Sequence, residues 1–463
     1  MIDVGSRLQL FVDEHLIEDM NGGASLRLHR PVSRGTVLTL ERPWEGALCG
    51  YPAIVPFEDG WRLYYRGWPE DSETSCVCVV KSKDGIEWTR PELGILEYGG
   101  SSANNVILSD ETMPGDRGAH NFCPMLDTRE GVPQDERYKA LAYGPRVSDR
   151  LRSLCAFASG DGLRWSALND GEPVFRAKHW RVMLDSQNVG FWDEVAGEYR
   201  LYGRNWIGAV RHIFLSRSDD FVNWSEPQSL DFGDAPLEDL YTNAIVPYFR
   251  APQMLIGFPK RFIPHRQSID DWPGGGLSEG VFICSRDGLR WHRHLEAFLR
   301  PGLGEDRWTE RSYMIARGII PTSESEISVY WMEDYRRPRP RIVRGTVRTD
   351  GFVSVNAPHS GGEFVTPPLT FQGARLILNA STSAAGSIRV EMQDERGRPL
   401  PGMSLADCPE IYGDGLELEV GWPKTTRLPR WNGVPVRLRF VIRDADLYSL
   451  RFCEEDGDGG TGH

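Results

Sequence analysis

One short motif, S-x-D-G-x-x-W, constrains the fold of this chain more than any other feature. It occurs as SKDGIEW (82–88), SGDGLRW (159–165) and SRDGLRW (285–291), with a looser copy, SRSDDFVNW, at 216–224. In such a motif Ser and Asp can bond the backbone of a tight turn, Gly can adopt a positive φ, and Trp can pack between neighbouring sheets. The motif therefore predicts a structural hairpin that recurs along the chain.

The segments around each copy have the pattern of short β-strands. Before the first copy stand YPAIVPFEDGWRLYYRG (51–67) and SCVCVVKS (75–82), rich in Val, Tyr and other strand-forming residues around the turn E-D-G. A fifth unit, YMIARGIIPTSESEISVYWMEDY and then RIVRGTVRTDGFVSV, ends in T-D-G-F in place of the motif. Repeated units of about four strands are typical of β-propellers, so we expect five blades.

The pattern changes after residue 357. Segments such as ARLILNAST, GSIRVEMQD and VRLRFVIRDADLYSLRF are alternating strands separated by turn residues, which is typical of a β-sandwich. The sequence thus predicts an all-β protein with a five-bladed β-propeller over 1–357, a β-sandwich over 358–453 and a disordered polar tail over 454–463.

Composition and charge exclude several classes of partner. The formal net charge of −13 argues against a nucleic-acid partner, and no apolar stretch is long enough to cross a membrane. The N-terminus lacks the basic and apolar regions of a secretory signal, so we expect a cytoplasmic location, with secretion open if a leader was removed. Because the chain has no paired C-x-x-C motifs and no calcium-loop signature, we expect no metal and no cofactor. A homo-oligomer stays open.

The inner strands of a propeller begin at a central funnel, and polar residues at those positions need a reason. Cleavage of a glycoside requires two carboxyl groups, one to protonate the leaving group and one to act as base or nucleophile. Asp185, Glu310 and Glu333 lie at expected funnel positions on different strands, so they are the predicted catalytic residues. Asp13 and Glu45 are reserve candidates for the same catalytic roles.

Other polar and aromatic residues are expected in the same funnel. Amides, cations and aromatic rings suit a polyol ligand, and the cations also suit an acidic or sulfated group on it. The predicted substrate-binding residues are Arg66, His120, Asn121, Gln187, Asn188, Arg204, Tyr241, Asn243, Lys260 and Arg261.

Several segments make the chain resemble known proteins over nearly its whole length. LFVDEHLIED, LDSQNVGFWDE, LYTNAIVPYFRAP and TDGFVSVNAP are similar to a bacterial group of uncharacterised glycosidases, which are distantly similar to invertase- and inulinase-type fructan hydrolases and to arabinanases. The resemblance implies the propeller fold and a saccharide substrate, with furanosides such as fructosides or arabinosides among the candidates. The fructosidase motifs N-D-P-N-G, R-D-P and E-C are absent, so catalytic roles cannot be transferred from that family.

Three functions follow from these observations. The first is a glycoside hydrolase that uses a carboxylic acid and a carboxylate in the funnel. The second is a sialidase-like hydrolase, in which Arg66, Arg204, Arg261 and Arg311 would hold a sugar carboxylate and Tyr241 or Tyr51 would be the nucleophile. The third is a carbohydrate-binding propeller without catalysis, because the fold alone does not establish an enzyme.

Overall fold

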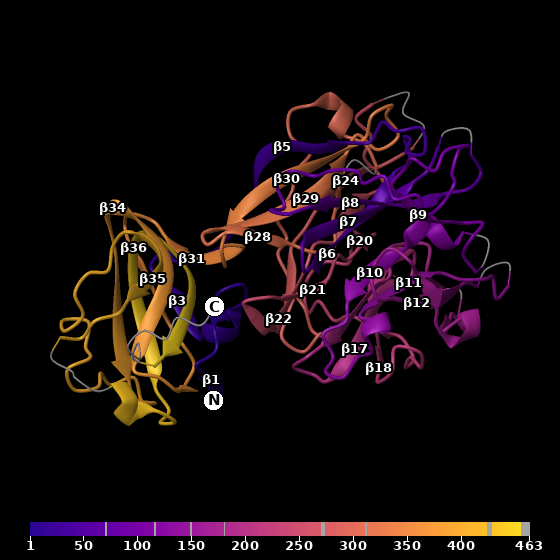
Figure 1. Ribbon diagram of the computed structural model, residues 1–463. Helices are drawn as coiled ribbons and strands as arrows, with labels where there is room; N and C mark the ends of the chain where they lie inside the picture. Colours follow the sequence, from indigo (N-terminus) through magenta and orange to yellow (C-terminus); the bar gives the residue numbers. More distant parts are fainter. Residues whose placement is uncertain are drawn as a thin grey trace. The chain divides into compact units, whose positions relative to one another are not determined.

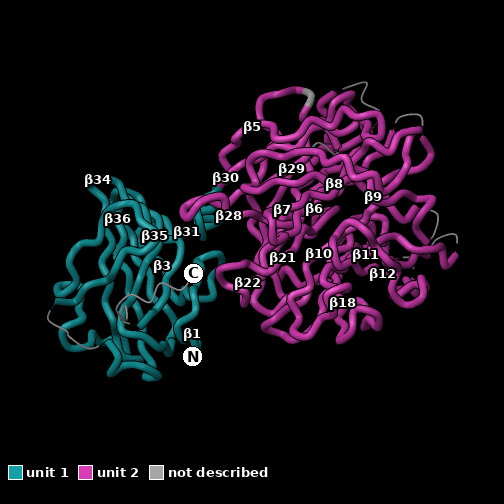
Figure 2. Tube along the Cα trace, viewed as in Figure 1, with its two compact units in different colours: residues 1–30, 347–463 teal, residues 31–346 magenta. Residues whose placement is uncertain are grey.

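The computed structural model describes residues 1–69, 72–114, 117–148, 151–179, 181–269, 274–310, 313–423 and 428–454. Over these residues the chain consists of β-strands, loops and short 3-10 turns such as η1 (Glu14–Leu16) and η2 (Gly118–Asn121), so the all-β prediction is confirmed (Figure 1). The chain divides into two compact units, of which unit 1 comprises residues 1–30 and 347–463 and unit 2 comprises residues 31–346 (Figure 2).

Unit 2 is built mainly from five antiparallel sheets that follow one another along the chain. The first sheet contains β6 (Gly50–Phe57), β7 (Gly60–Gly67), β8 (Cys76–Ser82) and β9 (Val106–Ser109). The second contains β10 (Cys123–Leu126), β11 (Tyr138–Tyr143), β12 (Ser153–Ser159), β13 (Ser166–Ala167) and β14 (Phe175–Arg176). The third contains β15 (Val182–Met183), β16 (Val189–Asp193), β17 (Glu198–Ile207), β18 (Val210–Ser218) and β19 (Gln228–Ser229).

The fourth sheet contains β21 (Val246–Tyr248), β22 (Ala251–Gly257), β25 (Ile283–Ser285) and β26 (His292–Arg293). A small sheet of β20 (Asp239–Leu240), β23 (Lys260–Ile263) and β24 (Leu277–Gly280) accompanies it. The fifth sheet contains β27 (Met314–Ile315), β28 (Ile320–Ser323), β29 (Glu326–Glu333), β30 (Arg341–Arg348) and β5 (Val32–Thr39).

Strand β5 joins the beginning of unit 2 to its end. It pairs antiparallel with β30, with Thr36 opposite Val343 and Gly35 opposite Arg344. The sequence predicted a different last strand for this sheet, the segment after T-D-G-F. That segment forms β31 (Val353–Ala357), which pairs with β4 (Ser25–Leu28) and β36 (Arg437–Cys453) of unit 1 instead. The long-range partner β5 carries no local signal that links it to β30.

The repeated motif forms the same turn in each of its copies. In the second copy Asp161 Oδ1 accepts the backbone N–H groups of Leu163 and Arg164 at 2.8 Å each, and Ser159 Oγ accepts the N–H of Gly162 at 2.8 Å. Trp165 Nε1 donates to the Gly162 carbonyl at 3.1 Å. The motif is thus a self-contained hydrogen-bonded turn, which is why seven residues suffice to specify it.

Tyrosines from the adjacent sheets hold these turns. Tyr64 of the first sheet donates to the Gly162 carbonyl in the second sheet's motif, and Tyr202 of the third donates to Gly288 in the fourth's, at 2.8 and 2.9 Å. Tyr330 of the fifth sheet donates in the same way to Gly85 in the first sheet's motif. The last sheet therefore neighbours the first, and buried apolar clusters fill the spaces between adjacent sheets.

We expect Gly162→Ala to lower the free energy of unfolding by about 2–5 kcal/mol, because both backbone strain and overpacking oppose it. The φ of Gly162 is +66°, and a Cβ there would lie 2.4 Å from Phe57 Cζ and 2.8 Å from the Tyr64 hydroxyl oxygen. Gly197 is the matched control, with a φ of +68° and nothing within 4 Å of its Cβ position. Gly197→Ala should cost only about 1–2 kcal/mol. Denaturant unfolding of both variants measures the difference, and equal losses would contradict the steric argument.

Unit 1 is organised around a sheet that draws strands from both ends of the chain. Strand β36 pairs with β2 (Gln9–Leu10), β31, β32 (Gly362–Val365) and the long β34 (Arg375–Gln393), while β3 (Asp19–Asn21) pairs with β32. Two further pairings complete the unit, β34 with β35 (Asp414–Glu419) and β1 (Ile2–Gly5) with β33 (Leu369–Phe371).

The predicted domain boundary therefore differs from the division in the structure. We expected residues 1–357 in one domain, whereas residues 1–30 and 347–357 belong with the C-terminal segment in unit 1. The N-terminal strands fill unit 1's apolar core, to which Val4, Phe11 and Leu16 contribute fully buried side chains. Their pairing partners lie more than 300 residues away, so local sequence could not assign them. The predicted tail at 454–463 falls outside the described residues except for Glu454.

Candidate active site

A polar and aromatic cavity of unit 2, which we call the arginine cavity, has a volume of about 400 Å³. It lies at the beginnings of the inner strands, because Tyr51 begins β6 and His120 precedes β10, while Asp185 precedes β16 and Tyr241 precedes β21. The lining residues are Leu48, Tyr51, Arg66, Trp68, Arg117, His120, Tyr143, Arg152, Asp185, Tyr241, Tyr335 and Arg336. Five of these are among the predicted site residues: Arg66, His120, Asp185, Tyr241 and the nucleophile candidate Tyr51.

Asp185 is the one carboxylate among the lining residues that the structure describes. Its side chain is 41% exposed and forms an ion pair with Arg204 of β17, which is 4% exposed. The amides of Asn121 and Asn188 hold the loop on both sides of Asp185, because each donates to the carbonyls of Leu184 and Ser186. A buried hydrogen-bonded loop thus presents an accessible carboxylate to the cavity.

The predicted substrate-binding amides are buried and serve this framework. Asn121, Gln187 and Asn188 are fully buried and Asn243 is 2% exposed. Gln187 Nε2 donates to the Pro52 carbonyl at 3.2 Å, and Asn243 Nδ2 donates to the Tyr202 carbonyl at 3.1 Å. The structure therefore uses these four amides to join the loops that carry the cavity residues.

Arg66 is the most buried guanidinium in the cavity lining. It is 5% exposed, and among the described residues it has no carboxylate at ion-pair distance. Its Nη2 and Nε donate to the Leu48 carbonyl at 2.6 and 3.1 Å, and its Nη1 lies 3.1 Å from the His120 ring nitrogens. The guanidinium also lies 4.9 Å from the Tyr51 ring centroid and 5.2 Å from that of Trp68.

Three further arginines surround the same space. Arg117 lies 5.8 Å from the Trp68 ring centroid, and Arg152 donates from Nε to the Tyr143 hydroxyl at 2.8 Å. Arg336 Nη1 lies 2.9 Å from Glu310 Oε1. Together with Arg66 and the Arg204 partner of Asp185, five guanidinium groups face two carboxylates, Asp185 and Glu310, among the residues that the structure describes. These described side chains therefore carry an excess of positive charge, although the whole chain is acidic.

Two tyrosines, Tyr51 and Tyr241, line the cavity together with Arg66 and Asp185. Tyr51 has a φ of +54°, which is unusual for a bulky residue and occurs mostly where function or packing enforces it. Burial, and after it the neighbouring Tyr241, raises the pKa of the Tyr51 phenol, so this group stays protonated at neutral pH. The Tyr241 ring centroid lies 4.7 Å from the Arg204 guanidinium carbon and 4.3 Å from Lys260 Nζ.

The other predicted carboxylates lie outside the cavity lining. Glu310 is 6% exposed and does not line the cavity, but it forms an ion pair with the lining residue Arg336. Glu333 accepts from Trp331 Nε1 at 2.8 Å and from Arg341 Nη2 at 3.0 Å, and lies 3.4 Å from Arg307. The reserve residue Glu45 is 1% exposed and accepts from Arg90 Nε at 3.0 Å and from the Tyr65 hydroxyl. These groups are engaged in ion pairs that sequence position alone could not foresee.

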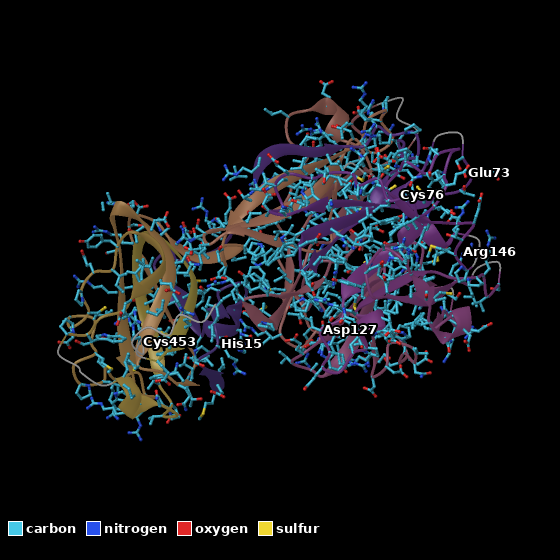
Figure 3. All side chains as sticks on the ribbon, in the orientation of Figure 1. His15, Glu73, Cys76, Asp127, Arg146 and Cys453 are labelled. Carbon is cyan, nitrogen blue, oxygen red and sulfur yellow. The ribbon has the colours of Figure 1, made fainter. Side chains whose placement is uncertain are left out.

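The remaining residues suggested by the sequence are likewise not among those that line the cavity. The reserve residue Asp13 belongs to unit 1, where its side chain accepts the His15 N–H at 3.2 Å. Arg261 forms ion pairs with Glu279 and Glu238, and Arg311 lies outside the described residues. Asp127, labelled in Figure 3, is buried beside Lys139 Nζ at 2.6 Å. In the part of the chain that the structure describes, no group of three His, Cys, Asp or Glu residues could hold a metal ion.

Sequence reasoning missed seven of the twelve residues that line the cavity. Trp68 and Tyr335 lie just after the ends of β7 and β29, in YYRGW and MEDYR, and Arg336 follows Tyr335 directly. Extending the search for site residues into the loops after these strands would have found all three. Arg117 and Arg152 lie in loops before the second sheet's strands, where no local pattern distinguishes a cavity residue from a surface arginine.

Comparisons with known proteins identify no family for this chain. No protein-family profile matches it, and no curated protein sequence matches it. Among the described residues no helix is long and apolar enough to cross a membrane.

Solved structures similar to the chain include glycoside hydrolases and a related enzyme. One glycoside hydrolase is 10% identical with a TM-score of 0.48, covering 69% of this chain and 92% of its own. An N-acetylgalactosamine deacetylase from F. plautii, in complex with blood group B trisaccharide, is 12% identical with a TM-score of 0.44. The match covers 71% of this chain and 96% of the deacetylase. A protein described with the GH130 family of mannoside phosphorylases, which contains glycoside hydrolases, is 14% identical with a TM-score of 0.44, covering 69% and 94%. At these TM-scores and identities the structural similarity assigns no function to this chain.

Proposed function

We propose that unit 2 is a five-bladed β-propeller and that unit 1 is a β-sandwich. The five sheets, the tyrosine contact from the fifth sheet to the first sheet's motif, and the closing strand β5 support the propeller. The continuous apolar core of unit 1 supports the sandwich. In such a propeller the beginnings of the inner strands surround an axial funnel, which corresponds to the position of the arginine cavity.

We infer that the protein is a carbohydrate-active enzyme that cleaves a glycosidic bond in an anionic saccharide. The observation that carries this proposal is the composition of the cavity, where one accessible carboxylate, Asp185, faces several guanidinium groups and aromatic rings. Aromatic faces stack on sugar rings, and guanidinium groups bind carboxylates in bidentate geometry. A neutral polyol would leave much of the positive charge in the cavity uncompensated, so the substrate class narrows to sugars that bear a carboxylate or sulfate.

In this proposal Asp185 is the base or nucleophile. Its carboxylate would either activate water or attack the anomeric carbon, and Arg204 would hold it in position. Glu310 is the second carboxyl group in this proposal. It forms an ion pair with Arg336, which lines the cavity. Because Arg336 both lines the cavity and pairs with Glu310, an anionic substrate bound by Arg336 would compete for this ion pair and make Glu310 available as the acid. Glu333 has no such connection to the cavity among the described residues.

A sialidase-like hydrolase is the second candidate, and the number of arginines in the cavity favours it. Arg66, Arg117 and Arg152 could hold a sugar carboxylate, whereas the sequence suggested Arg66, Arg204, Arg261 and Arg311 for this role. Tyr241 is the better nucleophile of the two tyrosines, because the raised pKa of Tyr51 opposes formation of its phenolate. In this mechanism Asp185 would act as acid or base beside it.

A screen of substrates tests the proposed function. The purified full-length chain is incubated with aryl-glycosides and oligosaccharides in matched pairs that differ only in a uronic carboxylate, and released aryl group or reducing sugar is measured. We expect turnover of carboxylated members and little turnover of their neutral partners. Binding of saccharides without turnover of any of them would favour a non-catalytic carbohydrate-binding propeller. Equal turnover of neutral and acidic members would contradict the anionic substrate but keep the glycosidase.

A further inference from the structure

A second cavity in unit 2, which we call the apolar pocket, shares no lining residue with the arginine cavity. Its volume is about 420 Å³, within the range of small-molecule sites. Inner strands of all five sheets contribute to it, including Ile54 and Pro56 of β6, Leu126 of β10, Trp192 of β16 and Tyr248 of β21. Tyr51 and Pro56 of the same strand line different cavities, so the two sites are separated by roughly 15 Å along β6.

The walls of the apolar pocket are largely aromatic. Trp61, Phe191, Trp192, Tyr248 and Phe249 line it, and Phe249 is 45% exposed at the turn between β21 and β22. Exposed aromatic side chains around a concavity are typical of ligand sites rather than of packed cores.

Two charged side chains lie among these apolar walls, Glu194 and Arg317. Glu194 is exposed, whereas Arg317 is buried. Arg317 is 7% exposed, and in the part of the chain that the structure describes it has no carboxylate at ion-pair distance. Its Nη1 donates to the Pro124 carbonyl at 3.3 Å, and its buried Nε has no hydrogen-bond partner among the described residues. A buried charge without a counter-ion is costly, so its retention needs a reason.

The backbone fixes Arg317 in this position. Its N–H donates to the Pro52 carbonyl at 3.0 Å, and its carbonyl accepts from the Ile54 N–H at 2.7 Å. The next residue, Gly318, has a φ of +102°, and a Cβ there would lie 2.7 Å from the Ile54 carbonyl oxygen. The backbone of Arg317 is therefore held beside β6, and its guanidinium donates to the Pro124 carbonyl of β10.

From these observations we propose that the apolar pocket binds a small monocarboxylate with an aromatic body. Its carboxylate would pair with Arg317 and accept the unused Nε–H, while its ring would pack against Trp61, Trp192 and Phe249. A fully apolar ligand would leave the arginine uncompensated, and a sugar would not match the apolar walls. This site is separate from the proposed glycosidase chemistry and does not depend on it.

Isothermal titration of the full-length chain with 1-naphthoate and with the neutral 1-naphthalenemethanol tests this site. We expect the carboxylate to bind at least about tenfold more tightly than the alcohol, as one charge-assisted contact requires. Arg317→Met should remove this preference without weakening the alcohol, and should leave the melting temperature unchanged or higher, because a buried unpaired charge is removed. A structural arginine would instead lower the melting temperature on substitution.

A second pair of variants covers the case in which Arg317→Met fails to fold. Phe249→Ser, at the exposed edge of the pocket, should weaken both ligands several-fold, whereas Val195→Ser, 63% exposed and outside the lining, should not. Equal affinity for naphthoate and the alcohol would overturn the proposal. So would binding that neither Arg317→Met nor Phe249→Ser changes, or no binding of naphthoate up to millimolar concentration.

Discussion

Asp185→Asn is expected to lower kcat for cleavage of the anionic glycoside at least about a thousandfold. Loss of a catalytic base or nucleophile commonly removes two to four orders of magnitude, and no other described carboxylate lines the cavity to replace it. KM should change little, because Asn keeps the size of the side chain and the loop is held by Asn121 and Asn188. Steady-state kinetics on the best substrate of the screen measures both constants.

Glu333→Gln is the matched control for this experiment. Glu333 is a predicted catalytic residue, but it is buried in contacts with Trp331 and Arg341 and does not line the cavity. We expect its kcat to stay within about threefold of the wild type, while the melting temperature falls because a buried ion pair is broken. A thousandfold loss of kcat in Glu333→Gln, together with full activity in Asp185→Asn, would reject Asp185 as the catalytic carboxylate and assign that role to Glu333.

Local patterns in the sequence identified the parts of the fold that local interactions determine. The S-x-D-G-x-x-W motifs closed the turns that the residue types suggested, because Ser, Asp and Trp bond backbone groups within the same seven residues. The pairing of β5 with β30 and of the N-terminal strands with β36 could not be predicted in this way. Those pairings join segments that lie hundreds of residues apart, so no local pattern indicates them.

The candidate site shows the same limit at the level of single side chains. Positions at strand beginnings suggested Tyr51, Asp185 and Tyr241, and the structure brings these three residues to one cavity. Position could not show which charged group would be neutralised by a neighbour, as Glu45 is by Arg90. Nor could it distinguish a substrate-binding amide from one that holds a loop, such as Asn121. Both distinctions depend on partners that lie tens of residues away along the chain.

Arg66→Met is expected to raise KM for the carboxylated substrate about a hundredfold and to leave its neutral counterpart within about threefold. Arg66 is a buried cation with no described carboxylate partner, so a substrate carboxylate would gain two charge-assisted hydrogen bonds there, each of about 1.5–3 kcal/mol. The comparison of acidic and neutral substrates isolates charge recognition, because any distortion of His120 or Leu48 would affect both.

Arg261→Met provides the matched control for the removal of a positive charge. Arg261 was expected in the same funnel, yet it is held by Glu279 and Glu238 and does not line the arginine cavity. This variant should keep the preference for acidic over neutral saccharides, even if its melting temperature falls. If Arg66→Met retained the preference while Arg261→Met lost it, the anion would bind elsewhere in unit 2. Of these two arginines, Arg66 is the one without an acidic partner among the described residues, so we expect the preference to depend on Arg66.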